Sequence, residues 1–297
     1  MAHTGIWRMP PRGLDRSRAG PEHKSNIMPQ PFAPPPATPH ALDRPALLAA
    51  LRARPATEGA KTSLPLCAPI DQTLPGGGLA RAALHEVVAG DRTAAAGFCA
   101  LVLARAAASG GRVLWIAADP MARPRGLGRF GLAPADLVLV WAPVAADALW
   151  AMEEALRCPG VAGALLELPE AAWDPTLGRR LRDAAGTGGA IGLLLRPDGP
   201  AAAAEVPETL TRWRVGGLGS SALSGQGGTP DLGDPCWQVE LLRCHGTRPG
   251  SLPARWQVRW RPAAERLEPD IPDADLSEPS PSPIAPRRPR LPRRHYG

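Results

Sequence analysis

The chain has 297 residues, enough for one large α/β domain with flanking segments, and 44% of them are apolar, as a globular core requires. Its net charge of +6 rests on arginine, because Lys24 and Lys61 are the only lysines, and it favours an anionic partner only modestly. No apolar run approaches the roughly 20 residues that span a bilayer, and no signal-peptide pattern is present, so we expect a cytoplasmic protein without a membrane partner.

The 37 prolines crowd both ends of the chain and suggest four segments. Residues 1–40, which contain Met28 as an alternative start, are rich in Pro and Arg without periodicity, and this composition predicts disorder. We expect a short helix and a linker over residues 41–73 and the folded domain over residues 74–262. Residues 263–297 are acidic first and basic at the end, which predicts a disordered tail.

Apolar strands alternate with helices through the first part of the domain. We expect strands at 84–88, 112–117, 137–141, 161–166 and 190–195, and helices at 94–109, 145–157 and 174–185. Asp174 followed by Pro175 is typical of an N-cap and a first helical position. Strands without polar alternation, separated by helices of this length, predict an α/β fold with a parallel sheet covered on both faces.

The middle helix has a mixed pattern. Leu149, Met152 and Leu156 share one face, which predicts contact with the core. Glu153 and Glu154 are expected to face water.

The pattern changes after residue 196. We expect further strands at 209–215, 236–244 and 255–260, of which the last two form a half-exposed antiparallel hairpin added to the parallel core. Trp256 and Trp260 alternate with arginines, so they are expected to face the core rather than to stack on nucleic-acid bases. Trp115 and Trp141 lie inside apolar strands and are also expected to be buried.

The loop after the first strand of a parallel α/β protein is the usual cradle for phosphate. Here it reads Ala89-Gly90-Asp91-Arg92-Thr93-Ala94-Ala95-Ala96, and its length fits the phosphate-binding pattern G-x-x-x-x-G-K-[ST]. Alanine occupies both glycine positions, the lysine position and the hydroxyl position, and Asp91 adds a negative charge. The pattern predicts a degenerate site without a nucleotide, cofactor or metal, in a protein that is not an enzyme.

Two stretches resemble the recombinase RecA. Residues 75–87 resemble its lead-in strand, with the degenerate loop placed after it, and residues 110–119 resemble its second core strand. Asp119 falls where RecA keeps its catalytic glutamate. The resemblance covers roughly residues 74–195 and implies a RecA-like P-loop-type core: a mainly parallel central sheet, helices on both faces, a C-terminal antiparallel hairpin and a degenerate nucleotide site.

Two further stretches, residues 148–157 and 237–244, resemble the ImuA family. These are RecA-like accessory proteins of bacterial mutagenic translesion synthesis, sometimes likened to the division inhibitor SulA. The resemblance implies work after DNA damage alongside a RecA-type recombinase, an inactive Y-family polymerase homologue and an error-prone polymerase.

Other residues capable of catalysis or metal binding have simpler structural explanations. The five cysteines form no Cys-x-x-Cys pair, which predicts reduced, mostly buried thiols. Asp119 and Glu167 have no lysine or magnesium-binding hydroxyl as partners, so we expect loop or helix-end carboxylates. His85 and Glu86 are neighbours in a strand and point to opposite faces, so a structural histidine is favoured over acid/base chemistry.

Two sets of arginines are candidates for contact with a partner protein or, weakly, with DNA. Arg255 and Arg259 lie on the polar face of the last expected strand, and Arg261 follows directly after it. The basic end of the chain contains Arg287, Arg288, Arg290, Arg293 and Arg294. For the strand arginines a solvated edge-strand surface is favoured over a functional one, whereas for the basic end a solubilising segment and a binding segment are equally consistent with the sequence.

The sequence thus favours a non-catalytic accessory protein in damage-induced (SOS-type) mutagenesis, associated with the nucleoid when engaged. A SulA-type inhibitor of cell division is the first alternative, and an active RecA-like ATPase is the second.

Overall fold

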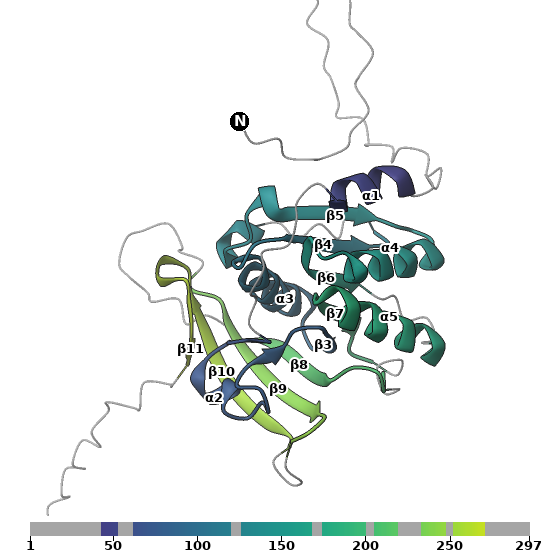
Figure 1. Cartoon of the computed structure of the whole chain (residues 1–297). Coiled ribbons are helices and arrows are strands. Elements are labelled where there is room, and N and C mark those ends of the chain that lie inside the picture. Colours follow the sequence, from purple (N-terminus) through teal and green to yellow (C-terminus); the bar gives the residue numbers. More distant parts are fainter. Residues whose placement is uncertain are drawn as a thin grey trace, which may run out of the picture.

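The structure is a computed structural model, and it describes residues 43–52, 62–119, 126–167, 174–199, 205–218, 233–247 and 252–270. Within these residues a nine-stranded sheet has the order β11-β10-β9-β8-β3-β7-β6-β4-β5 (Figure 1). The parallel part comprises β3 (Ala83–Ala89), β4 (Arg112–Ala117), β5 (Leu137–Trp141), β6 (Val161–Glu167), β7 (Ile191–Pro197) and β8 (Thr211–Leu218). The antiparallel extension comprises β9 (Cys236–Cys244), β10 (Ala254–Arg261) and β11 (Arg266–Pro269).

Helices cover both faces of the parallel part (Figure 1). The helices are α1 (Arg44–Arg52), α2 (Ala68–Asp71), α3 (Arg92–Ala107), α4 (Ala145–Arg157) and α5 (Pro175–Gly188), with short 3-10 turns at Leu127–Phe130, Pro134–Asp136 and Pro262–Ala264. One core lies between the sheet and α3, and a second lies between the sheet and α1, α4 and α5. The expected α/β class, with a mainly parallel sheet and antiparallel strands after it, is confirmed.

Local sequence explains how several of these elements begin and pack. Asp174 caps α5 by accepting a hydrogen bond from the backbone N–H of Thr176 at 2.8 Å, and Pro175 takes the first helical position, as predicted.

The five cysteines are free thiols, four of them buried. None of the described helices is long and apolar enough to cross a membrane.

Part of the expected linker belongs to the core. Strand β1 (Ser63–Leu64) pairs with β2 (Leu79–Ala80), and α2 lies between them. Leu66 and Ile70 are buried in the core that contains α3. The linker prediction over residues 62–73 is therefore wrong, because these short apolar elements have too little periodicity to be recognised before they pack.

The sheet also extends beyond the expected domain boundary at residue 262. After a turn at Pro262–Ala264, β11 pairs antiparallel with β10, and the N–H of Asp270 donates to the carbonyl oxygen of Gln257 at 2.8 Å. This pairing shields an otherwise open edge of β10. The expected disordered tail therefore begins no earlier than residue 271; residues 1–40 and 271–297 lie outside the described part of the chain.

The strand at the other edge of the sheet differs from the sequence-based expectation. Trp115 in β4 is buried as predicted, but Trp141 in β5 is 38% exposed, and Leu139 and Val144 beside it are more exposed still. Strand β5 pairs only with β4 among the described strands, so its apolar run lacks a neighbour on one side. The sequence pattern of an edge strand in a parallel sheet is the same as that of a central one.

Helix α4 also differs from the sequence-based expectation, since Glu153 does not face water. Its side chain is only 5% exposed and forms ion pairs with Arg157 of the same helix and with Arg180 of α5. The cause is α5, which packs along α4 and covers the carboxylate.

Candidate functional site

The connection between β3 and α3 takes the place expected for a phosphate loop. The strand ends at Ala89 and the helix begins at Arg92, so the connection consists only of Gly90 and Asp91. The expected loop over residues 89–96 is therefore wrong in length, and most of it is helix. Asp91 causes the early start, because its carboxylate accepts the N–H of Ala94 at 2.8 Å and caps the helix.

The backbone amides of this connection are directed at protein acceptors. The N–H groups of Gly90 and Asp91 both donate to the carbonyl oxygen of Val215 at the end of β8, at 2.9 and 3.4 Å. A side chain at Gly217 would approach the Ala94 methyl group to 3.3 Å, which shows how closely β8 packs on the start of α3. In a phosphate loop, the corresponding backbone amides bind an anion. Here the amides of Gly90 and Asp91 are hydrogen-bonded to β8 instead, where this strand contacts the start of α3.

Three of the four alanines in place of the phosphate-loop residues lie in the first turns of α3, and the fourth, Ala89, ends β3. Ala95, at the lysine position, is fully buried and packs in the core between α3 and the sheet. Ala94 and Ala96 are partly buried against the same core. The side chain at position 95 therefore points into the protein interior.

The carboxylates expected near a nucleotide have other partners. Glu167 is the last residue of β6, where it accepts a hydrogen bond from the Trp115 indole N–H at 2.6 Å and forms an ion pair with Arg92 of α3. The expected helix-end or loop position of Glu167 is thus a strand end. Asp119 follows β4 in an exposed loop, as expected.

His85 is a fully satisfied structural histidine, as predicted. Its Nε2 lies 2.8 Å from the carbonyl oxygen of Ala80 and its Nδ1 lies 2.7 Å from the hydroxyl of Thr211. A carbonyl only accepts, so Nε2 carries the proton. The Thr211 hydroxyl oxygen accepts a hydrogen bond from the indole N–H of Trp213 at 2.6 Å, and the hydroxyl donates a hydrogen bond to Nδ1 of His85. The imidazole therefore has a proton on Nε2 alone and is neutral.

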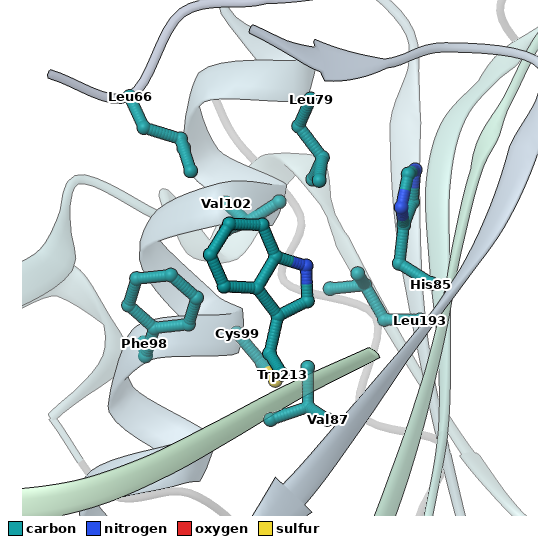
Figure 2. A pocket seen from close by; sticks show the side chains of 9 residues that line it. All are labelled: Leu66, Leu79, His85, Val87, Phe98, Cys99, Val102, Leu193 and Trp213. Carbon is teal, nitrogen blue, oxygen red and sulfur yellow. The ribbon is translucent and has the colours of Figure 1, made fainter. Parts of the chain in front are cut away.

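The cavity beside His85 is small and closed by apolar side chains. Figure 2 shows the Trp213 ring with Phe98 and Val102 of α3 on one side and His85 on the other. The cavity volume is about 10 Å³, the size of one water molecule. Burial also raises the pKa of the Cys99 thiol in its wall. The interior next to the degenerate loop is therefore a packed core.

The buried imidazole predicts a pH dependence of stability. Burial lowers the pKa of His85 to about 4, from an ordinary value of 6.5. Between pH 6.5 and 4 the unfolded chain binds a proton there and the native protein does not, so the native state loses up to about 3 kcal/mol as the pH falls. Urea unfolding of the native protein is expected to show this loss of stability. For His85→Gln, the free energy of unfolding is expected to fall less steeply with decreasing pH over the same range. Equal slopes would contradict it.

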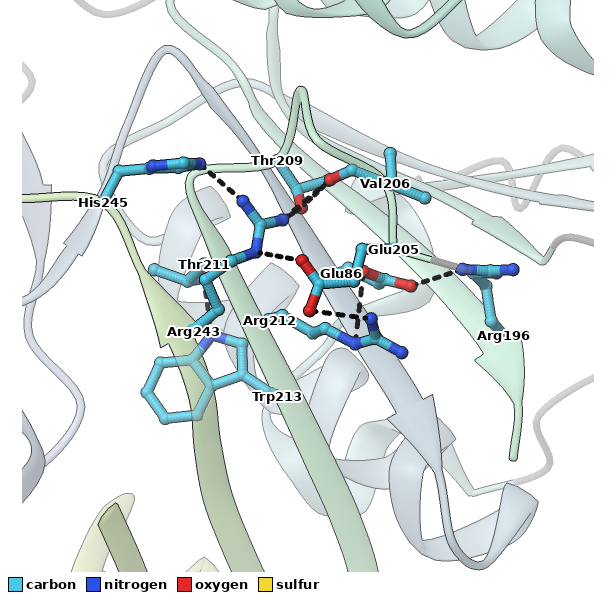
Figure 3. Close-up of polar contacts among 10 residues, drawn as sticks. All are labelled: Glu86, Arg196, Glu205, Val206, Thr209, Thr211, Arg212, Trp213, Arg243 and His245. Atoms are coloured by element: carbon cyan, nitrogen blue, oxygen red, sulfur yellow. Dashed lines mark hydrogen bonds and ion pairs between the residues drawn. The ribbon is translucent and has the colours of Figure 1, made fainter. Parts of the chain in front are cut away.

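Glu86, the neighbour of His85, lies on the opposite face of the sheet in a buried ionic cluster (Figure 3). Its carboxylate is 2.6 Å from Arg196 of β7 and 3.6 Å from Arg212 of β8. Arg212 and Arg243 of β9 both approach Glu205, at 3.6 and 3.4 Å. The cluster joins the parallel part of the sheet to the antiparallel extension. Sequence reasoning missed it, since these residues are far apart in the chain.

The arginines of the last expected strand face carboxylates. Arg255 forms an ion pair with Glu240 at 3.1 Å, and Arg259 with Asp270 at 2.8 Å. Arg261, the last residue of β10, is 2.7 Å from Asp234. A phosphate backbone would have to compete with these carboxylates. The five arginines of the basic end, Arg287, Arg288, Arg290, Arg293 and Arg294, lie outside the described residues.

No protein-family model matches the sequence. Protein ImuA from two strains of Caulobacter vibrioides is 36% identical over 197 residues, an alignment that covers 61% of this chain and 78% of that protein. Among solved structures, the crystal structure of the RadB recombinase is similar with a TM-score of 0.49 and 11% identity, over 70% of this chain and 99% of that chain. The likeness to ImuA proteins, expected from two short stretches, thus extends over most of the relative's length, and this chain belongs to the ImuA family.

Proposed function

We propose that this protein is a non-catalytic accessory factor of damage-induced mutagenesis and translesion synthesis, which acts by binding other proteins. Its membership of the ImuA family is the observation that carries this proposal. The family resemblance names the partners: a RecA-type recombinase and an inactive Y-family polymerase homologue.

Three features of the β3–α3 connection support a role without nucleotide chemistry. Two of its amides donate to Val215, and the Asp91 carboxylate takes the amide of Ala94. The residue at the lysine position, Ala95, points into the core. Arg92 pairs with the acidic Glu167, at the end of the strand where an ATPase would hold magnesium.

Exposed apolar groups on the sheet edge support a role in protein contact. Leu139 and Trp141 of β5 and Val144, which precedes α4, are exposed, and an edge strand with exposed apolar side chains is a typical surface for a protein partner. The ion pairs of Arg255, Arg259 and Arg261 leave less positive charge on β10 for contact with DNA, which favours a protein partner there.

Mutation frequency in cells tests the proposal. Cells that lack this protein are expected to survive normally without damage but to lose the rise in mutation frequency after ultraviolet irradiation, and the full chain is expected to restore it. Titration of the purified protein with magnesium-ATP is expected to give no binding heat. A micromolar dissociation constant would support the ATPase alternative, and filamentation on overproduction would support the division inhibitor.

A further inference from the structure

A groove between α4 and α5 lies on the side of the sheet that α1, α4 and α5 cover, opposite the side on which α3 packs. Its volume is about 290 Å³, at the lower end of the ~300–1,000 Å³ range of ligand pockets. Its lining combines apolar side chains with a charged pair and includes Leu149, Trp150 and Glu153 of α4 and Leu177 and Arg180 of α5. Among the described residues, no element covers it.

Helix α4 has more apolar surface than is buried in the core, and the unburied part lines the groove. Ala148, Ala151, Met152 and Ala155 are buried in the core beneath the helix. A second stripe, with helical spacing, comprises Ala146, Leu149, Trp150 and Glu153. Its apolar members are only partly buried or exposed, so this stripe is available to another molecule.

One wall of the groove is held in place by α1. The Arg44 guanidinium lies 4.6 Å from the ring centre of Trp150 and forms an ion pair with Asp147 at 2.8 Å. These contacts fix the indole before any partner binds, which lowers the entropy cost of association. They also occupy a face of the ring that a nucleic-acid base would need for stacking.

The charged part of the groove presents a cation. The Glu153 carboxylate is buried and shared by Arg157 and Arg180, whose side chains are 48% and 55% exposed. Arg157 also faces Glu154 at 3.8 Å. Of the two charged residues that line the groove, Arg180 is therefore the one that solvent reaches, and its planar guanidinium suits a carboxylate.

We propose that the α4–α5 groove binds a peptide segment of a partner protein that places adjacent apolar side chains beside an aspartate or glutamate. The apolar side chains would cover Leu149, Trp150 and Leu177, and the carboxylate would meet Arg180. Arg180 is the one cation among the residues that line the groove, whereas a nucleic-acid strand needs a row of cations along its backbone. The inference rests on the proposed function, because it names the chemistry of a partner.

A random-peptide library displayed on phage and selected on the full chain tests this inference. We expect selected peptides to combine apolar residues with Asp or Glu. In fluorescence anisotropy, Ala146→Trp, which fills the groove from an exposed helix position, is expected to weaken the best peptide by roughly tenfold or more. Ala145→Trp, the exposed neighbour outside the groove lining, is the matched control and is expected to bind normally. Equal binding to both variants would overturn the proposal, as would selective binding of oligo-dT by the groove.

The same variants in cells separate the two hypotheses. With the groove proposal correct, Ala146→Trp fails to restore damage-induced mutation and Ala145→Trp restores it. If both restore it, the groove proposal fails while the proposed function stands. If loss of the whole protein leaves damage-induced mutation unchanged, the proposed function itself fails.

Discussion

Replacing Ala95 with lysine is expected to lower the free energy of unfolding by about 3 kcal/mol or more, instead of restoring a phosphate site. The Ala95 side chain is fully buried between α3 and the sheet. Lysine there adds four side-chain heavy atoms to a packed core and places an ammonium group away from water. Both effects destabilise the native state.

Urea unfolding measures this loss, and Thr93→Lys is its matched control. Thr93 is exposed in the same helical turn, so a lysine there is expected to change stability by no more than about 0.5 kcal/mol. An Ala95→Lys protein with native stability and magnesium-ATP binding would contradict both the burial of this position and the non-catalytic proposal.

Removing the charge of Glu86 is expected to cost about 3–5 kcal/mol of stability, the range for a broken buried ion pair. The Glu86 carboxylate has no exposed surface, and its partners Arg196 and Arg212 are each less than a tenth exposed. Glu86→Gln keeps the shape of the side chain but removes the buried carboxylate that Arg196 and Arg212 share, while Arg212 retains its ion pair with Glu205. The junction between β3, β7 and β8 is therefore expected to weaken.

Glu154→Gln is the control for this prediction. Glu154 is 30% exposed and lies 3.8 Å from Arg157, so its loss is expected to cost no more than about 1 kcal/mol. Denaturant unfolding of both variants measures the difference. A Glu86→Gln protein as stable as Glu154→Gln would show that water reaches the two arginines.

The sequence by itself determined the parallel core of this protein and its family. Continuous apolar runs such as Val161–Leu166 indicate strands buried on both faces, and Asp174-Pro175 marks a helix start, because both signals are local. His85 was also predicted as a structural residue, since neighbours in a strand face opposite sides.

Only the tertiary structure decided which surfaces meet. Trp141 is exposed because β5 is an edge strand, and Glu153 is buried because α5 packs beside it. Strand β11 forms because β10 supplies its partner, and the β3–α3 connection is short because Asp91 caps the helix against β8. Burial and pairing depend on residues distant in the chain, and periodicity along one segment carries no information about its neighbours in space.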